Sequence, residues 1–250
     1  MPHVYGWQHI VYLLIFFSVC AGALAAVLLK VKTAKTIDLI VKCLGGALLV
    51  LIILNRIFIC MHKDYNWWLL IPDSFCGLSS LCLAICALVC KRDALPLHCL
   101  CYISFWGGMI VTFYPDFLGQ ASYFMYPATI TGLLHHGLAA FISVFMIATG
   151  FMKPSLKKFY AFPCGLSFMT VYGLFLLDGL HFKEAMFIGK PLIPNSFLTW
   201  YVIAVVLIVG TLGLVWLYEY LIKRYNAKRQ IKAIEEVEEI DEAAATDAEN

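Results

Sequence analysis

The chain has 250 residues, of which 62% are hydrophobic and 14% charged, and its formal net charge is +2. A soluble domain carries about 25% charged residues, so this composition excludes a soluble globular domain. It favours an all-α polytopic integral membrane protein, because a bilayer accommodates helices of about 20 apolar residues. Nothing in the distribution of charge is typical of a nucleic-acid-binding surface.

Apolar runs separated by lysine, proline or polar clusters predict seven transmembrane helices in one membrane domain, residues 1–222. The first run lacks a basic segment before it and a small-residue cleavage site, so we expect a span there and not a signal peptide. Residues 223–250 are too polar for the bilayer, and we expect a cytoplasmic tail, first basic and then acidic, with a short helix that frays. The predicted spans are 9–29, 38–60, 67–90, 95–114, 126–150, 159–181 and 197–222.

Lysine and arginine are unevenly divided between the two sets of connecting segments. Loops one, three and five and the tail carry thirteen bases, and the opposite segments carry three. The positive-inside rule therefore places the N-terminus outside and the C-terminus in the cytoplasm. The thirteen are Lys30, Lys32, Lys35, Lys91, Arg92, Lys153, Lys157, Lys158, Lys223, Arg224, Lys228, Arg229 and Lys232, and the three are Lys63, Lys183 and Lys190.

Ionisable and polar side chains gather at one predicted depth, in the outer half of the membrane, where such groups are usually functional or paired. Cys76 is nine residues into the third span and His136 nine residues into the fifth. At 1.5 Å per residue both lie about 13 Å below the outer surface, and the neighbouring His135 points about 100° away from His136. The layer also contains Asn55, Arg56, Asp73, Asp116 and Asp178.

Most of the ten cysteines lie inside apolar runs, where a free thiol packs as a small hydrophobic side chain. Cys82, Cys86 and Cys90 recur every four residues and form one stripe of a helix. No CxxC pair is present, and we expect neither a metal site nor a cofactor. A single histidine in a span, such as His98, commonly packs or bonds a neighbouring carbonyl.

Five short motifs lie between about Trp67 and Tyr201. They are IPDSFC at Ile71–Cys76, FWGG at Phe105–Gly108, YPDF at Tyr114–Phe117, HHG at His135–Gly137 and GKPLIPNSFLTWY at Gly189–Tyr201. In order and spacing this set resembles the YwaF family of bacterial integral membrane proteins and, more distantly, their animal relative, an acyltransferase that remodels ether phospholipids.

The resemblance implies that Cys76 and His136 match a cysteine and a histidine that are catalytic in the animal relative. The chain departs from the family at Ser74, where the family has a histidine, and at Asp73, where it has a leucine. A literal LPLH occurs at Leu95–His98, but it belongs to the next span. The resemblance therefore supports the fold more strongly than the activity.

The leading hypothesis is acyl transfer or acyl hydrolysis on a membrane lipid. Cys76 would attack an ester carbonyl, and His136 would take the thiol proton and later protonate the leaving alkoxide. The acceptor would be a lysolipid hydroxyl or water, in a bacterial cytoplasmic membrane or in an endomembrane of a eukaryote. The substrate-binding candidates are Arg56, Asn55 and Asp116, and the supporting candidates are His135, Asp73 and Asp178.

The alternative hypothesis is a small transporter or receptor that uses histidine, aspartate and arginine as a proton relay or ligand site. The seventh span has no lysine for a retinal Schiff base, and the chain has no internal inverted repeat that would favour a transporter. A membrane scaffold with an acidic regulatory tail is also left open, as are the lipid class, the acyl donor and the oligomeric state.

Overall fold

The computed structural model describes residues 5–62, 66–115, 124–191 and 197–248, with side chains up to residue 227. These residues are entirely helical apart from turns and connecting segments. The elements are α1 (Trp7–Lys30), α2 (Ala34–His62), η1 (Trp67–Leu70), α3 (Phe75–Val89), α4 (Leu97–Phe113), α5 (Pro127–Ala148), η3 (Leu156–Lys158), α6 (Ala161–Leu174), the π-helical turn η4 (Phe175–Gly179) and α7 (Trp200–Ala248).

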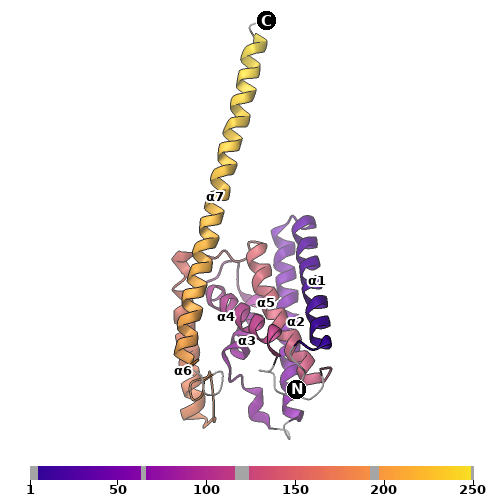
Figure 1. The fold of residues 1–250 in the computed structure, drawn as a ribbon, viewed down its shortest axis with the longest axis vertical. Helices are drawn as coiled ribbons and strands as arrows, with labels where there is room; N and C mark the ends of the chain where they lie inside the picture. Colours follow the sequence, from indigo (N-terminus) through magenta and orange to yellow (C-terminus); the bar gives the residue numbers. More distant parts are fainter. Residues whose placement is uncertain (1–4, 63–65, 116–123, 192–196, 249–250) are drawn as a thin grey trace.

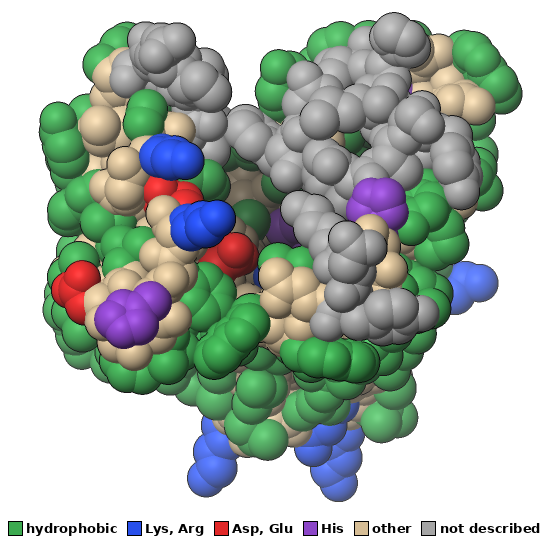
Figure 2. Space-filling model, turned by 90° about the horizontal axis from the view of Figure 1, so that it is seen from below, with side chains coloured by type: hydrophobic (Ala, Val, Ile, Leu, Met, Phe, Trp, Pro, Cys, Tyr) green, Lys and Arg blue, Asp and Glu red, His purple; other side chains and the backbone are tan. Residues whose placement is uncertain are grey.

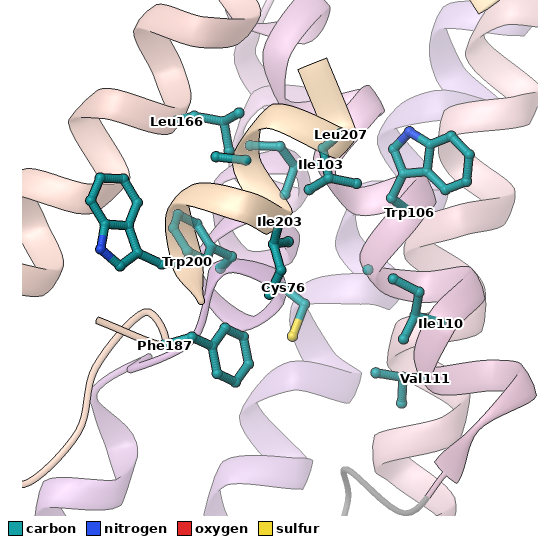
Figure 3. A pocket seen from close by; sticks show the side chains of 13 residues that line it. Cys76, Ile103, Trp106, Ile110, Val111, Leu166, Phe187, Trp200, Ile203 and Leu207 are labelled. Carbon is teal, nitrogen blue, oxygen red and sulfur yellow. The ribbon is translucent and has the colours of Figure 1, made fainter. Parts of the chain in front are cut away.

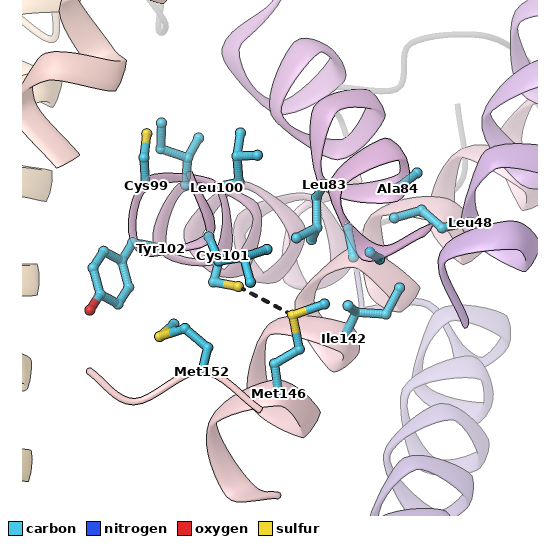
Figure 4. Close-up of a cluster of buried hydrophobic side chains, with 14 of the residues drawn as sticks. Leu48, Leu83, Ala84, Cys99, Leu100, Cys101, Tyr102, Ile142, Met146 and Met152 are labelled. Atoms are coloured by element: carbon cyan, nitrogen blue, oxygen red, sulfur yellow. Dashed lines mark hydrogen bonds between the residues drawn. The ribbon is translucent and has the colours of Figure 1, made fainter. Parts of the chain in front are cut away.

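Helices α2, α3, α4 and α5 pack against one another and form the centre of the molecule. α1 lies at one flank against α5, and α6 and α7 lie at the other flank, with α6 packed on α4 (Figure 1). Fully buried side chains at the centre include Leu48 on α2, Leu83 on α3 and Ile142 on α5. Figure 4 shows them beside α4, where the Cys101 thiol donates to the Met146 sulfur at 3.7 Å.

Five segments are long and apolar enough to cross a bilayer: α1, α2, α5, Leu156–Gly179 and the Trp200–Ala227 part of α7. Helices α3 and α4 are apolar but have 15 and 17 residues, or about 22 and 26 Å at 1.5 Å per residue. Within the described residues, each of the seven predicted spans contains an α-helix, but helix length supports five spans. The chain is an all-helical, membrane-embedded protein.

The third predicted span, 67–90, is wrong as a single helix. Trp67–Leu70 form η1, and α3 begins only at Phe75. Pro72 explains the break, because a proline disfavours helical backbone at the residue before it and has no N–H to donate. Ser74 then caps the new helix by accepting a hydrogen bond from the Gly77 backbone N–H at 3.2 Å.

The tail also differs from the expected short, fraying helix. α7 runs without a break from Trp200 to Ala248, and in Figure 1 it projects far beyond the other helices. The sequence beyond residue 227 is rich in alanine and glutamate, which have high helix propensity. Local propensity therefore extends the last membrane helix through the polar tail.

Asp93, in the loop between α3 and α4, joins that loop to the segment after α5. Its carboxylate accepts from the Lys153 backbone N–H at 3.1 Å, lies 2.9 Å from His98 Nε2 and pairs with the Lys158 ammonium. Burial by itself would raise the pKa of Asp93, but Lys158, the Lys153 N–H and His98 outweigh burial and lower that pKa. His98 is therefore a buried partner of a loop carboxylate.

Gly45 and Gly46 offer a test of the contact between α2 and α3. A Cβ at Gly45 would lie 2.7 Å from the Ala87 Cβ and 3.1 Å from the Ala84 carbonyl oxygen, whereas nothing lies within 4 Å of a Cβ at Gly46. Gly45→Ala should lower the free energy of unfolding by about 1–3 kcal/mol through overpacking. Gly46→Ala should raise it by about 0.5–1 kcal/mol, because alanine loses less backbone freedom than glycine. Thermal unfolding in detergent measures both changes, and equal shifts would contradict the contact.

Asp93→Asn should lower the free energy of unfolding near pH 7 by about 1–2 kcal/mol, because the site is partly exposed. The unfolding midpoint should fall with it. Because the pKa of Asp93 is lowered in the folded protein, its stabilisation is present above the unfolded-state pKa and is lost as the pH falls through the folded value. The difference from the wild type should therefore shrink as the pH approaches the ordinary aspartate pKa of about 3.9 and goes below it. A pH-independent difference, or the same loss in a variant of the exposed Asp178, would refute this role.

Candidate functional site

Cys76 lies in the first turn of α3, one residue after the helix begins. Ser74 holds this turn, because its Oγ accepts from the Gly77 backbone N–H at 3.2 Å and from the Cys76 thiol at 3.5 Å. The N-terminus of a helix carries partial positive charge, which favours negative charge nearby. The thiol is therefore positioned where the helix would stabilise an anionic sulfur.

Two consecutive glycines on α4 bring α3 and α5 close to it on different sides. A Cβ at Gly107 would lie 2.8 Å from the Cys76 Cβ, and a Cβ at Gly108 would lie 2.3 Å from the His136 carbonyl oxygen. Consecutive residues of a helix point about 100° apart. Cys76 and the backbone of His136 therefore contact adjacent faces of α4 at the same level along its axis.

The Cys76 side chain lines a small apolar cavity of about 100 Å³. Figure 3 shows the sulfur pointing into the space between Phe187 and the α4 residues Ile110 and Val111. α7 closes another part of the cavity with Trp200, Ile203 and Leu207. Apart from the thiol and the indole rings, the cavity offers only hydrocarbon surface.

His135 and His136 are buried side by side, and their ring centroids are 3.9 Å apart. The two rings therefore lie together, although a regular helix directs successive side chains about 100° apart. His135 Nδ1 lies 3.2 Å from the Thr131 carbonyl oxygen. His136 Nδ1 is buried and has no hydrogen-bond partner among the described residues.

Arg56 on α2 lies beside the turn that holds Cys76. Its Nη1 donates to the Leu69 carbonyl oxygen at 3.1 Å and lies 3.9 Å from Asp73 Oδ1. Its Nη2 would be 2.7 Å from a Cβ at Gly77, in the first turn of α3. The guanidinium therefore places a positive charge next to the first turn of α3.

The end of the molecule away from the C-terminus is hollowed between two lobes. Figure 2 looks onto this end, and basic, acidic and histidine side chains lie around the hollow. The Met186 backbone N–H donates to the Asp73 carbonyl oxygen at 2.8 Å. The segment after η4 is thereby attached directly to the residues that precede α3.

The structure brings some of the predicted site residues together and separates others. Asn55 is buried, and its Nδ2 donates to the Ala128 carbonyl oxygen at 2.8 Å and to Thr131 Oγ1 at 3.2 Å, so it fastens α2 to α5. Asp178 is exposed on η4 and forms no hydrogen bond or ion pair with either histidine in the described part of the chain. Asp116 lies outside the described residues.

The Cys76 thiol donates to Ser74 and, among the described residues, makes no hydrogen bond to a histidine. Catalytic contacts are often long in a protein without substrate and tighten when substrate binds. This structure therefore contains no direct Cys76–His136 hydrogen bond among the described residues, and the predicted approach of the two side chains through one water stays a prediction.

Sequence reasoning missed the residues that position the site. Ser74 was treated as a departure from a family motif, yet a serine directly before an apolar run is a helix-start signal. Gly107 and Gly108 belong to the FWGG motif, to which the sequence analysis assigns no role. Phe187 and Leu207 gave no local signal, because their part in the cavity depends on how α7 and the segment before it return to α3 and α4.

Residues 4–228, nearly the whole chain, match the family model described as the TMEM164 family. No curated protein and no solved structure matches the chain.

The resemblance to the YwaF family was therefore wrong, because the family that matches is a different one. Its short motifs consist mainly of proline, glycine and aromatic residues. Such residues are common at the ends of membrane helices and where two helices pack closely. They therefore do not distinguish one family of helical membrane proteins from another. The expectation of a bacterial membrane loses the support that it drew from YwaF.

Ser74→Ala should lower the free energy of unfolding by about 1 kcal/mol, because it removes the acceptor that caps α3. Ser74→Asn should keep most of the stability, since asparagine is an equally good cap. Ser167→Ala is the matched control, because that exposed hydroxyl on α6 bonds only the Pro163 carbonyl oxygen of its own helix, at 2.9 Å. Thermal unfolding in detergent compares the three variants, and equal midpoints for Ser74→Ala and Ser167→Ala would exclude the cap.

Proposed function

The chain belongs to the TMEM164 family, and from the geometry of its candidate site we propose that it is a lipid acyltransferase or acyl hydrolase with Cys76 as nucleophile. The substrate would be a membrane lipid, because the site is built among apolar helices. The reaction would take place at the level of α4 where Gly107 contacts Cys76.

One observation carries the proposal: the Cys76 thiol borders an apolar cavity. An engineered apolar cavity of about 150 Å³ binds benzene, so about 100 Å³ receives the first few carbons of an acyl chain. A thiol at the wall of a hydrocarbon cavity suits a substrate whose reactive carbonyl is joined to a hydrocarbon chain. The rest of the chain would extend between the helices toward the lipid.

In the first half-reaction, the Cys76 sulfur attacks the carbonyl carbon of the lipid ester while His136 takes the thiol proton. A C–S bond forms, and the carbonyl oxygen receives the electron pair of the C=O π-bond. When this intermediate collapses, the C–O ester bond breaks and His136 gives its proton to the leaving alkoxide. The products are a thioester on Cys76 and a free hydroxyl on the lipid.

In the second half-reaction, a lysolipid hydroxyl or water loses its proton to His136 and attacks the thioester. The C–S bond breaks, and the proton returns to the Cys76 sulfur. A lysolipid acceptor makes the reaction a transfer, and water makes it a hydrolysis. The free Nδ1 of His136 supports its role as base, and its neighbour His135 would orient it.

Arg56 would bind the negative oxygens of the substrate, on the phosphate or on the reacting carbonyl. Its Nη2 approaches the turn that holds Cys76, and only its Nη1 is hydrogen-bonded within the described residues. A guanidinium matches phosphate and carboxylate geometry because its donors form a rigid fork. Asp73 and the Leu69 carbonyl would hold Arg56 in place during the reaction.

The proton-relay transporter has weaker support. That hypothesis pairs a buried histidine with Asp178, but Asp178 is exposed on η4 and bonds neither histidine in the described residues. It also gives no role to the cavity beside Cys76. The acyl-transfer proposal uses the thiol, the cavity and the free imidazole nitrogen together.

The proposed topology is seven membrane crossings, with the N-terminus outside and the C-terminus in the cytoplasm. The loops after α1, α3 and α5, together with the helix ends at Lys30 and Lys35, contain eight of the thirteen bases outside the tail, which supports this orientation. Although α3 and α4 are short, both pack within the central group of helices, so protein and not lipid surrounds much of each. η1 and the segment up to Ser74 would complete the third crossing.

A topology experiment can separate this arrangement from one with fewer crossings. A single cysteine in the segment after Lys30 and one in the segment after Lys153, in a chain without its own cysteines, should be modified only from the cytoplasmic side. A cysteine beside Trp67 should be modified only from outside. Membrane-impermeant maleimide on intact cells and on inverted vesicles measures this. Labelling of the α1–α2 loop and the Trp67 segment from the same side would reject the topology.

Cys76→Ser should abolish acyl turnover, and His136→Ala should lower the turnover number by about 10²–10⁴-fold by removing the general base. His135→Ala should have a smaller effect. The assay follows a labelled acyl chain from phospholipid to lysophospholipid and to free fatty acid, with purified protein in vesicles. The wild type should also form a hydroxylamine-sensitive acyl-enzyme that Cys76→Ser lacks.

The matched control is Cys43→Ser, because Cys43 is exposed on α2 and does not line the cavity. This variant should retain both the turnover and the acyl-enzyme. Full turnover in Cys76→Ser, with a normal unfolding midpoint, would refute the nucleophile.

A further inference from the structure

A second pocket lies at the other end of the central helices, where α2 begins and α3 ends. It has a volume of about 440 Å³ and is lined by side chains of α2, of the last turn of α3, of the α3–α4 loop and by Phe151 after α5. The charged residues in its lining are Asp38, Lys42, Lys91 and Arg92. Three cations and one anion leave a net charge of +2 inside one concave surface.

Arg92 is fixed in this pocket by contacts on three sides. Its Nε donates to Asp38 Oδ1 at 2.6 Å, and its Nη2 donates to the Ala34 carbonyl oxygen at 2.8 Å. Its guanidinium carbon lies 5.5 Å from the centre of the buried Phe151 ring, a cation–π distance. These contacts leave the Nη1 donor unused within the described residues and orient the guanidinium in advance of any ligand.

Lys42 lies inside the predicted second span, 38–60. It is four residues, or about 6 Å, from the start of that span, and its side chain is exposed. It forms no hydrogen bond or ion pair within the described residues, and neither does Lys91. An ammonium at such a depth is costly unless an anion or an aqueous cavity receives it, and the pocket is the place that can hold that anion.

We propose that this pocket binds the phosphate headgroup of an anionic phospholipid from the leaflet on that side of the membrane. Phosphate matches a fixed guanidinium flanked by lysines, because arginine binds it with a fork of donors and lysine adds point charge. Basic pockets between membrane helices are recognised sites for such headgroups. The volume is far above the ~30 Å³ share of one water molecule, so a phosphate ester has room.

A lipid fits this pocket better than a free phosphate ion. Lys42 belongs to the predicted second span, 38–60, so its side chain is within reach of lipid headgroups at that surface of the membrane. Val89, which also lines the pocket, is 73% exposed and offers apolar surface for the start of an acyl chain. The site is independent of the proposed reaction, because none of its residues belongs to the candidate functional site.

The test measures binding of dioctanoyl phosphatidate, dioctanoyl phosphatidylcholine and inorganic phosphate to the full purified chain in neutral detergent. Phosphatidate should bind at least about tenfold more tightly than phosphatidylcholine, and its affinity should fall with added salt. Lys42→Gln and Lys91→Gln should each weaken phosphatidate binding about fivefold, and Lys42→Arg should keep it. Lys157→Gln should change it by less than about twofold, because Lys157 is exposed on η3, outside the pocket.

Three results would overturn the proposal. Phosphatidylcholine could bind as tightly as phosphatidate, which would show that the acyl chains alone are bound. Lys157→Gln could weaken binding as much as Lys42→Gln, which would show a general effect of surface charge. Inorganic phosphate could displace phosphatidate at an equal concentration, which would show a site for the free ion. Normal unfolding midpoints of the exposed lysine variants keep each result interpretable.

Discussion

α3 and α5 pack closely against α4 because the α4 residues at the two contact points are glycines, Gly107 and Gly108. In a bilayer the lipid is as apolar as the helices, so helices associate through close packing and polar contacts. Gly107 and Gly108 allow a separation that any larger residue would prevent. Gly45 against Ala87 gives the same kind of contact between α2 and α3. The candidate site depends on this packing, because the two glycines set the positions of Cys76 and His136 relative to α4.

Several polar side chains in the described helices join one helix to another. Asn55 connects α2 to α5, His9 Nε2 lies 2.9 Å from the Thr112 carbonyl oxygen and connects α1 to α4, and Trp106 donates to Thr211 on α7 at 3.0 Å. His136 Nδ1 is one of a small set of buried polar atoms without a partner among the described residues, and an unpaired buried group costs about 1–3 kcal/mol. Such a group is expected where a substrate or a proton will occupy it, which is how the proposed reaction uses it.

The helical architecture follows from the sequence to a large extent. Within the described residues each predicted span contains a helix. The third span shows the limit of that reasoning. Apolar residues dominate Trp67–Val89 as a whole, but Pro72 and Ser74 end one helical segment and start another. One proline and one capping serine hardly change the average hydrophobicity of a span. They do determine where the backbone hydrogen bonds of one helix end and those of the next helix begin.

The site shows the same division. Cys76, His136 and Arg56 could be selected from the sequence, because ionisable and thiol groups are rare in apolar helices and their positions along each helix can be counted. Counting along Trp67–Cys76 as a helix was wrong, yet Cys76 and the His136 backbone do contact α4 at one level, because Gly107 and Gly108 are consecutive. The family could not be read from short motifs, and a comparison over residues 4–228 was needed.

By itself the sequence determined an all-helical membrane protein, the order of its helices and the chemical types available for a site. Those properties depend on local composition and on the spacing of apolar residues along the chain, and both can be read from one sequence. Only the tertiary structure decided that Cys76 faces a cavity closed by α7, that Asn55 is a fastening between helices, and that Lys42, Lys91 and Arg92 share one pocket. The rotation of each helix about its axis is set by contacts with residues distant in sequence, and no local pattern contains that information.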